Sequence, residues 1–109
     1  MLYFAYGSNL SHEHMRRRCK DSYFIKPINL KGYLLTFRGK HGAADIEKNK
    51  NSKVLGGLYE ISESDEKQLD IYEEYPILYE KMYFSNFGKK VMTYIMLKKQ
   101  HLKIPPLDI

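Results

Sequence analysis

The chain opens with the stretch Leu2-Tyr3-Phe4-Ala5-Tyr6-Gly7-Ser8-Asn9-Leu10, in which an apolar and aromatic run passes directly into a tight turn. The apolar run is typical of a short buried strand over Leu2 to Tyr6. Gly7 then frees the backbone to turn, and Ser11 is placed to cap a helix over about Ser11 to Cys19. The succession of strand, glycine turn and capped helix predicts a strand-to-helix junction at the start of the fold.

The backbone of this junction is a candidate anion site. A strand-to-helix turn leaves successive N–H groups without backbone partners, and the first turn of the following helix adds more. Such a nest binds a carboxylate, or the oxygen of a carbonyl group as it becomes anionic. The alternative is an ordinary glycine turn capped by Ser8 or Asn9. A serine nucleophile is not favoured, because Leu10 stands where a nucleophile elbow needs glycine.

A second candidate lies at the end of a predicted helix, in the stretch Leu69-Asp70-Ile71-Tyr72-Glu73-Glu74-Tyr75-Pro76. Glu73 has tyrosines and further acids close to it in the sequence. Partial burial and repulsion between carboxylates both raise a carboxyl pKa, toward the value that a general acid/base needs near neutral pH. The alternative is a solvated last turn of the helix, although the helix dipole disfavours acids at this end. Glu74 is the other carboxylate that could share the role.

The segments between these two motifs alternate between apolar runs and turn residues. Tyr23 to Leu30 is predicted to be extended, and Pro27 restricts it to an edge or an irregular stretch. Gly32 to Phe37 is predicted to be another strand, and Gly39 to Ser52 a polar loop. Val54 to Ile61 is predicted to be a strand whose paired glycines indicate a bulge or another backbone passing close by.

The last part of the chain completes the predicted fold. Ser62 and Asp65 fit a capping box that starts the second helix. Leu78 to Phe84 and Val91 to Leu97 are predicted to pair as a hairpin that is apolar enough for both faces to be covered. Five or six strands and two short helices, in a chain this small, predict an α+β fold. We expect a small mixed β-barrel, a curled or closed sheet with the helices over it.

Length and composition limit the class of protein. A chain of 109 residues is predicted to be a single domain over residues 1–109. Its one cysteine, Cys19, excludes an intrachain disulfide and does not indicate an oxidising compartment. No stretch has the length of a membrane span, so a soluble cytoplasmic protein is expected. The net charge of +5 is segregated, because eight of the thirteen acids lie from Glu60 to Glu80. Such segregation favours solvated faces of opposite sign over a nucleic-acid surface.

The glycine turn and the acidic segment together resemble the gamma-glutamylcyclotransferase-like family. The matching residues are Tyr6-Gly7-Ser8-Asn9-Leu10 and then Leu69, Asp70 and Glu73, with softer matches in Val54-Leu55-Gly56-Gly57-Leu58-Tyr59. The resemblance covers roughly Met1 to Leu97 and implies a compact mixed barrel in which Glu73 is the acid/base and no cofactor is needed. The residues that it assigns to substrate binding are Tyr6, Gly7, Ser8, Asn9, Leu10 and Tyr79.

The sequence departs from the family in two places. Glu74 stands where family members commonly carry glycine. Relatives also continue past a proline-containing stretch into a final helix, and this sequence ends at Pro105-Pro106-Leu107-Asp108-Ile109. We therefore expect a closing element to be absent.

The activity implied by the resemblance is release of 5-oxoproline and a free amine from a gamma-glutamyl amine or amino acid. The substrate's own alpha-amino group is the nucleophile, and the identity of the leaving amine stays open. One alternative is a non-catalytic module that holds a small ligand in the same pocket. Another is a basic nucleic-acid-binding protein that uses Arg16 to Lys20 and the lysine-rich C-terminal third of the chain, but no recognised nucleic-acid motif is present. The expected partner is a small molecule, without nucleic acid or membrane. No metal site is predicted, because His12 and His14 point to different faces of their helix.

Overall fold

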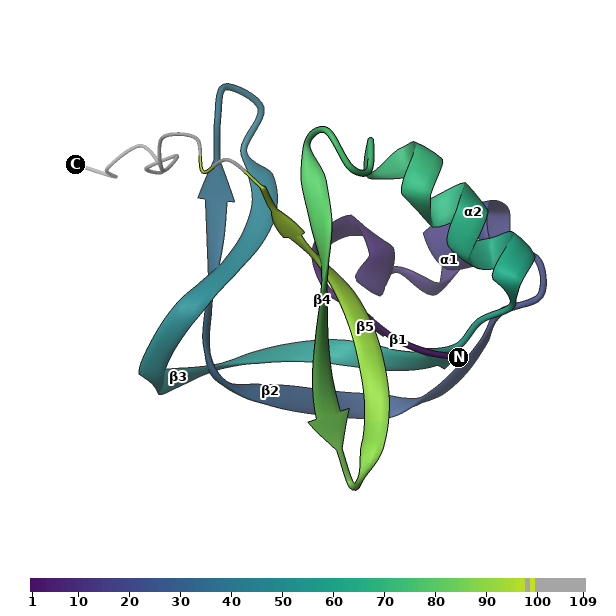
Figure 1. Ribbon diagram of the computed structural model, residues 1–109, viewed down its shortest axis with the longest axis horizontal. Helices are drawn as coiled ribbons and strands as arrows, with labels where there is room; N and C mark the ends of the chain where they lie inside the picture. The colour runs from purple at the N-terminus through teal and green to yellow at the C-terminus, as the bar shows by residue number, and fades with distance from the viewer. Residues whose placement is uncertain (98, 100–109) are drawn as a thin grey trace.

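The computed structural model describes residues 1–97 and 99, without the side chains of Ser8 and Asn9. Segment 100–109, where a closing element is expected to be absent, lies outside the described residues. Within the described residues, five strands, two α-helices and one 3₁₀-helix follow one another (Figure 1). Their order is β1 (Leu2–Ala5), η1 (Gly7–Leu10), α1 (His12–Arg18), β2 (Tyr23–Arg38), β3 (Ala43–Glu60), α2 (Glu63–Tyr72), β4 (Tyr79–Asn86) and β5 (Lys89–Met96).

The five strands form one mixed sheet in the order β2-β3-β1-β5-β4. The short strand β1 lies in its centre, antiparallel to β3 and parallel to β5. The predicted α+β fold of five or six strands with two short helices is confirmed, with five strands. The sheet is not closed into a barrel, because β2 and β4 remain at its edges. Figure 1 shows both helices together beside the end of the sheet where the chain begins.

The predicted polar loop over residues 39–52 is wrong, because β3 begins at Ala43 and the connection from β2 is only the turn 39–42. Gly39 and Gly42 both have positive φ angles there, which glycine adopts without steric cost. The polar residues that follow pair with β2, as in Tyr33 with Lys48. These residues resemble a loop in the sequence because this part of the two-stranded ribbon formed by β2 and β3 is largely exposed. The apolar alternation that marks a half-buried strand is therefore missing.

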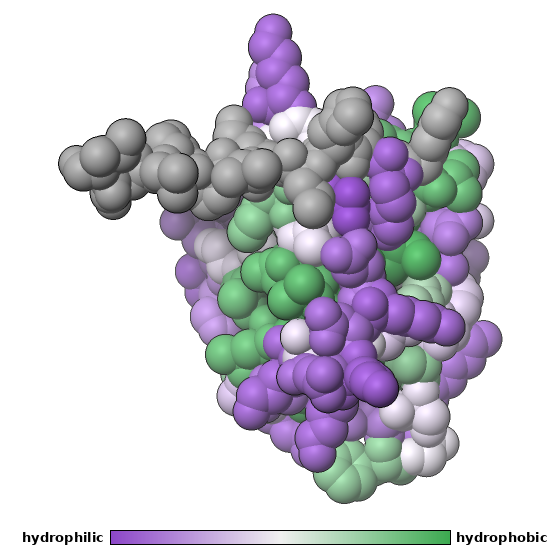
Figure 2. Space-filling model, turned by 90° about the vertical axis from the view of Figure 1, so that its left-hand side faces the viewer, coloured by the Kyte–Doolittle hydropathy of each residue, from purple (hydrophilic) through white to green (hydrophobic). Residues whose placement is uncertain are grey.

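The two predicted segments over residues 23–30 and 32–37 are one continuous strand, β2, at the edge of the sheet. The edge position agrees with the presence of Pro27. The pairing with β3 shifts between Lys31 and Tyr33, and Gly32 between them has a positive φ angle. Figure 2 shows the bent end of this ribbon, where exposed hydrophobic residues lie among hydrophilic ones. The exposed hydrophobic residues at this end of β2 are Leu34, Leu35 and Phe37.

Strand β1 is buried on both faces. Tyr3 and Ala5 belong to a core cluster that also contains residues of both helices. Phe4 and Tyr6 belong to a second cluster, formed with β2, β3 and β5. Successive side chains of a strand point to opposite faces, so Tyr3, Phe4 and Ala5, with Tyr6 directly after the strand, anchor β1 in both clusters. The glycine turn that follows β1 is therefore attached to the most buried strand of the sheet.

Local signals for the helices and the hairpin are confirmed. The Ser11 side chain accepts from the His14 amide, and Ser62 and Asp65 form the predicted capping box. β4 and β5 pair over their full length. The expectation that both faces of the hairpin are covered holds for most of β5 but is wrong for β4, which is an edge strand with only Tyr79 buried. Among the described residues, no helix is long and apolar enough to cross a membrane.

Candidate active site

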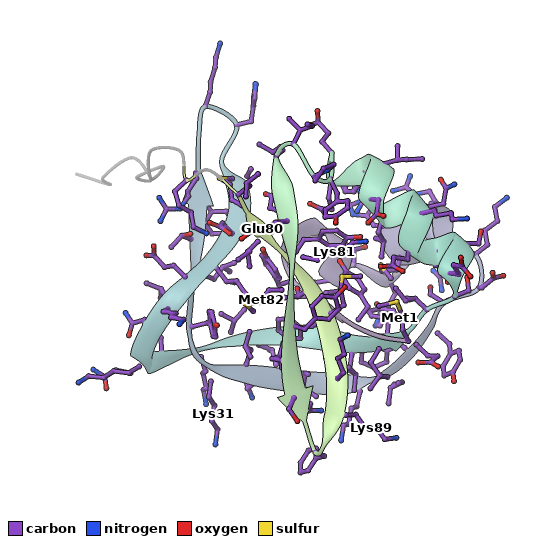
Figure 3. All side chains as sticks on the ribbon, viewed as in Figure 1. Met1, Lys31, Glu80, Lys81, Met82 and Lys89 are labelled. Carbon is purple, nitrogen blue, oxygen red and sulfur yellow. The ribbon has the colours of Figure 1, made fainter. Side chains whose placement is uncertain are left out.

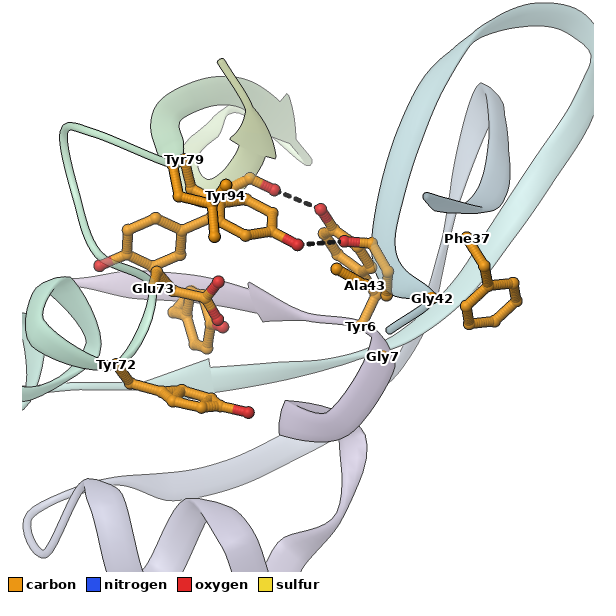
Figure 4. A pocket seen from close by; sticks show the side chains of 12 residues that line it. Tyr6, Gly7, Phe37, Gly42, Ala43, Tyr72, Glu73, Tyr79 and Tyr94 are labelled. Carbon is orange, nitrogen blue, oxygen red and sulfur yellow. Dashed lines mark hydrogen bonds between the residues drawn. The ribbon is translucent and has the colours of Figure 1, made fainter. Parts of the chain in front are cut away.

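A pocket of about 380 Å³ opens where the β1–η1 junction, the tip of the β2–β3 ribbon and the end of α2 meet (Figure 4). Tyrosine rings make up much of its wall, and among the described residues Glu73 is the only charged one that lines it. The lining residues are Tyr3, Tyr6, Gly7, Phe37, Gly42, Ala43, Ala44, Tyr72, Glu73, Leu78, Tyr79 and Tyr94. Glu73, Tyr6, Gly7 and Tyr79, which the sequence proposed for one site, thus line one pocket.

The end of α2 brings Glu73 into the pocket. Glu73 is the C-cap of the helix, and Glu74 follows it with a left-handed φ of 51°. The Glu74 amide donates to the Ile71 carbonyl, and the Tyr75 amide donates to the Asp70 carbonyl. These are the two hydrogen bonds of a Schellman motif. The motif reverses the chain between the two acids, so the Glu73 side chain is half-buried in the pocket while Glu74 is exposed.

The opposite wall contains the glycine of the predicted turn. Gly7 has a φ of 65°, and a Cβ at this position would lie 2.7 Å from the Cβ of Ala44. Both observations require glycine here, for conformation and for space. Residues 7–10 form η1, so the backbone of Ser8 and Asn9 continues from this wall. Leu10 is 42% exposed and is not among the residues that line the pocket.

Tyr6 and Tyr79 have hydroxyl groups bound to backbone carbonyls. The Tyr79 hydroxyl donates to the Ala44 carbonyl over 2.6 Å, and the Tyr6 hydroxyl donates to the Tyr94 carbonyl (Figure 4). Burial raises the pKa of both hydroxyls, and the negative charge of Glu73 raises them further. Both tyrosines are therefore neutral at physiological pH. Each hydroxyl has donated its one hydrogen, and its oxygen retains lone pairs with which it can accept from a bound cation.

Asp45 is a charged residue near the pocket that the sequence analysis did not propose. Its side chain is 0% exposed and accepts hydrogen bonds from the Met96 amide at 2.9 Å and the Lys99 ammonium at 2.5 Å. Its charge also raises the pKa values of Tyr6 and Tyr79. The available sequence signal is an acid placed in a run of small and apolar residues, Ala43-Ala44-Asp45-Ile46. Such an acid is costly to bury without partners, which predicts a tertiary contact but does not identify it.

Tyr94 lines the pocket and was not proposed from the sequence. It is the one aromatic residue of the apolar strand β5, and its place in the sequence does not indicate that it faces a pocket. Its ring lines the pocket, and its carbonyl receives the Tyr6 hydroxyl.

The remaining reactive side chains lie elsewhere. Cys19 is buried in the core, and burial raises the pKa of its thiol to about 12, so the thiol is protonated and unreactive at physiological pH. The Tyr59 hydroxyl lies 2.8 Å from Nδ1 of His12, and His12 is exposed. Within the part of the chain that the structure describes, no three His, Cys, Asp or Glu residues are grouped so that they could hold a metal ion.

Comparison with known proteins gives a consistent family and fold. The family model for gamma-glutamyl cyclotransferase, AIG2-like proteins matches residues 3–108. A solved structure described as a gamma-glutamyl cyclotransferase has a TM-score of 0.79 and 24% identity, over 94% of this chain and 69% of its own. An uncharacterised protein from Homo sapiens has a TM-score of 0.77 and 25% identity, over 93% of this chain and 69% of its own. An AIG2-like protein from Mus musculus has a TM-score of 0.68 and 19% identity, over 92% of this chain and 78% of its own. No curated protein matches the chain.

Proposed function

We propose that this chain, which belongs to the gamma-glutamyl cyclotransferase, AIG2-like family, is an enzyme that cyclises gamma-glutamyl amines or gamma-glutamyl amino acids. The products are 5-oxoproline and a free amine, and the reaction uses no cofactor. The observation that carries the proposal is that Glu73, the one charged residue of the lining within the described part of the chain, shares that lining with the Gly7 turn. The pocket thereby combines a proton carrier with backbone amides for an anion.

The reaction is an intramolecular acyl transfer. Glu73 takes a proton from the substrate's alpha-ammonium group, and the resulting amine nitrogen attacks the gamma-carbonyl carbon. The carbonyl oxygen becomes an oxyanion, a five-membered ring closes, and the bond to the leaving nitrogen breaks. Two protons leave the attacking nitrogen and two arrive on the leaving nitrogen, with Glu73 as their carrier, so Glu73 ends in the state in which it began.

The remaining residues bind and orient the substrate. Because the nucleophile is part of the substrate, the enzyme mainly has to fold a flexible chain into attack geometry. The backbone N–H groups of Gly7, Ser8 and Asn9 hold the substrate carboxylate or the developing oxyanion. The hydroxyl oxygens of Tyr6 and Tyr79 accept from the alpha-ammonium group, since their own hydrogens are donated to backbone carbonyls. The ammonium group is thus directed toward Glu73.

Replacement of the proton carrier tests this proposal. Glu73→Gln is expected to retain the fold and ligand binding but to lower the rate of 5-oxoproline release by about 10²–10⁴-fold or more. Glutamine has nearly the same shape and still forms hydrogen bonds, but it cannot accept a proton from an ammonium group. The measurement is release of 5-oxoproline from a panel of gamma-glutamyl amino acids and amines.

Glu74→Gln is the matched control, because it removes the neighbouring charge from an exposed position. It is expected to lose much less activity than Glu73→Gln. A loss confined to Glu74→Gln would mean that the other carboxylate carries the proton. If the unaltered protein turns over no member of the panel, the pocket is a small-ligand binding site without catalysis.

A further inference from the structure

We infer that Tyr94 and Asp70 are positioning residues that fix the Glu73 carboxylate opposite the Gly7 turn. Neither is required to exchange a proton with substrate. The inference rests on the proposed function for its kinetic consequence, but its geometric content concerns the placement of Glu73 alone.

The first part of the connection joins Tyr94 of β5 to the last turn of α2. The Tyr94 hydroxyl donates to Oδ1 of Asp70 over 2.6 Å, and Asp70 lies three residues before Glu73. Burial and the charge of Asp70 both raise the pKa of Tyr94, so its hydroxyl remains a donor. A charge-assisted hydrogen bond of this length is among the stronger kinds in proteins, and it attaches the end of the helix to the sheet.

Lys81 of β4 strengthens the attachment from a second strand. Its ammonium group lies 3.0 Å from Oδ1 of Asp70 and 2.9 Å from Oε2 of Glu66, one helical turn earlier. Figure 3 shows Lys81 on the side of β4 that faces α2, while Glu80 and Met82 lie on the other side. This alternation is the one expected along a strand. The last two turns of α2 are thus held by both strands of the hairpin.

Tyr94 also contacts the chain after Glu73 and the other half of the pocket. Its ring lies edge-on to the ring of Tyr75, with centroids 6.5 Å apart, and Tyr75 is two residues beyond Glu73. Its carbonyl oxygen accepts a hydrogen bond from the hydroxyl of Tyr6, the residue that precedes the Gly7 turn. One residue therefore contacts the segments on both sides of the acid/base and the segment that leads into the proposed anion site.

The physical need for such an attachment follows from the position of Glu73. A helix of ten residues has little stability by itself, and its terminal turn is the part most prone to fray. Glu73 is the cap of this turn, so contacts outside the helix must set its position. A displacement of about 1 Å at a catalytic group is enough to cost about 10²-fold in rate.

Tyr94→Phe tests the inference, because it removes the hydroxyl and keeps the pocket-lining ring and the backbone carbonyl. We expect kcat for 5-oxoproline release to fall by about 10- to 100-fold. KM should change by less than about threefold, since the Gly7 side of the pocket is retained. Asp70→Asn should have a similar effect. The double variant should lose no more than the more impaired single variant, because the two residues act as one unit.

Tyr83→Phe is the matched control, since Tyr83 is an exposed tyrosine on β4 outside the pocket. It should retain the kcat of the unaltered protein. A purely structural role would instead lower the melting temperature without a selective loss in kcat, or would give additive losses in the double variant. Either result, or an unchanged kcat in Tyr94→Phe, would overturn the inference.

A second measurement separates this inference from the proposed activity. The carbon resonance of the Glu73 carboxyl group, followed by NMR over a pH titration, should change in Tyr94→Phe and Asp70→Asn but not in Tyr83→Phe. If the unaltered protein shows no turnover, the proposed function fails, and the NMR comparison alone decides the inference. Identical Glu73 titrations in all four proteins would refute it.

Discussion

At position 74 a glutamate occupies backbone geometry that suits glycine. Its φ of 51° is left-handed, and for a residue with a Cβ this conformation costs roughly 1–2 kcal/mol. The position is the C′ residue of a Schellman motif, where glycine is the usual choice. This geometry explains why the family pattern commonly has glycine at this position, and here the same motif forms with glutamate in its place. The motif forms with either residue, at different cost.

We therefore expect Glu74→Gly to stabilise the protein by about 1 kcal/mol. Chemical denaturation monitored by circular dichroism measures this difference. Glu74→Gln is the control, because it removes the same unfavourable charge from the C-terminal end of α2 but retains the backbone strain. Equal stabilities of the two variants would show that charge, and not the left-handed backbone, determines the effect.

Among the elements, the position of strand β1 depends on the absence of a side chain at Gly56 in the neighbouring strand β3. A Cβ on Gly56 of β3 would lie 2.5 Å from the Ala5 carbonyl oxygen and equally close to the Phe4 ring. β3 therefore reaches its hydrogen-bonding distance from β1 only with glycine here. This is the close passage of another backbone that the paired glycines predicted. Because β1 leads directly into Tyr6 and Gly7, the same contact determines where one wall of the pocket lies.

Gly56→Ala is expected to destabilise the protein by about 1–3 kcal/mol and to lower activity by displacing the end of β1. Gly57→Ala is the matched comparison, since a Cβ there would meet only side-chain atoms, of Tyr59 at 3.0 Å and Phe24 at 3.2 Å. Side chains can move aside more easily than a backbone carbonyl, so Gly57→Ala should cost less. Urea denaturation of both variants measures the two losses in the free energy of unfolding. A larger loss in Gly57→Ala than in Gly56→Ala would contradict the proposed role of the close backbone contact at Gly56.

Across the whole molecule, folding buries weak acids in neutral form. Burial is the largest cause of the raised pKa values of Tyr6, Tyr79, Tyr94 and Cys19. Their ordinary values are 10.0 for tyrosine and 9.0 for cysteine. The unfolded chain thus loses these protons at lower pH than the native protein does. These groups contribute their full stabilisation below the ordinary pKa values, and the contribution declines as pH rises toward the native ones.

The free energy of unfolding should accordingly fall as pH is raised from about 9 to 11, because the native state then binds more protons than the unfolded state. Denaturation curves at closely spaced pH values measure the slope. Tyr6→Phe, which removes one of the buried hydroxyls, should make the decline shallower. A stability that stays constant or increases through this range would contradict the assignment.

The features that depend on neighbours along the chain could be predicted from the sequence. The caps at Ser11 and Ser62, the turn at Gly7 and the β4–β5 hairpin were all predicted from residues a few positions apart. Such features form because a side chain or a glycine acts on its own backbone, so local spacing carries the information. The family resemblance rests on the same short motifs. It directed attention to Glu73 in preference to Glu74, and the Schellman turn now gives the physical reason why their side chains diverge.

The surroundings of those motifs depend on contacts between residues that are far apart in the sequence. The Tyr6 hydroxyl meets a carbonyl 88 residues away, and the Asp45 carboxylate meets the Met96 amide 51 residues away. The exposed polar half of β3 is a strand because β2 supplies its hydrogen-bonding partners, and the sheet stays open because β2 and β4 do not meet. These contacts depend on how strands are ordered and curved in space. Spacing along the chain does not encode that arrangement, which follows from burying both faces of β1 at once.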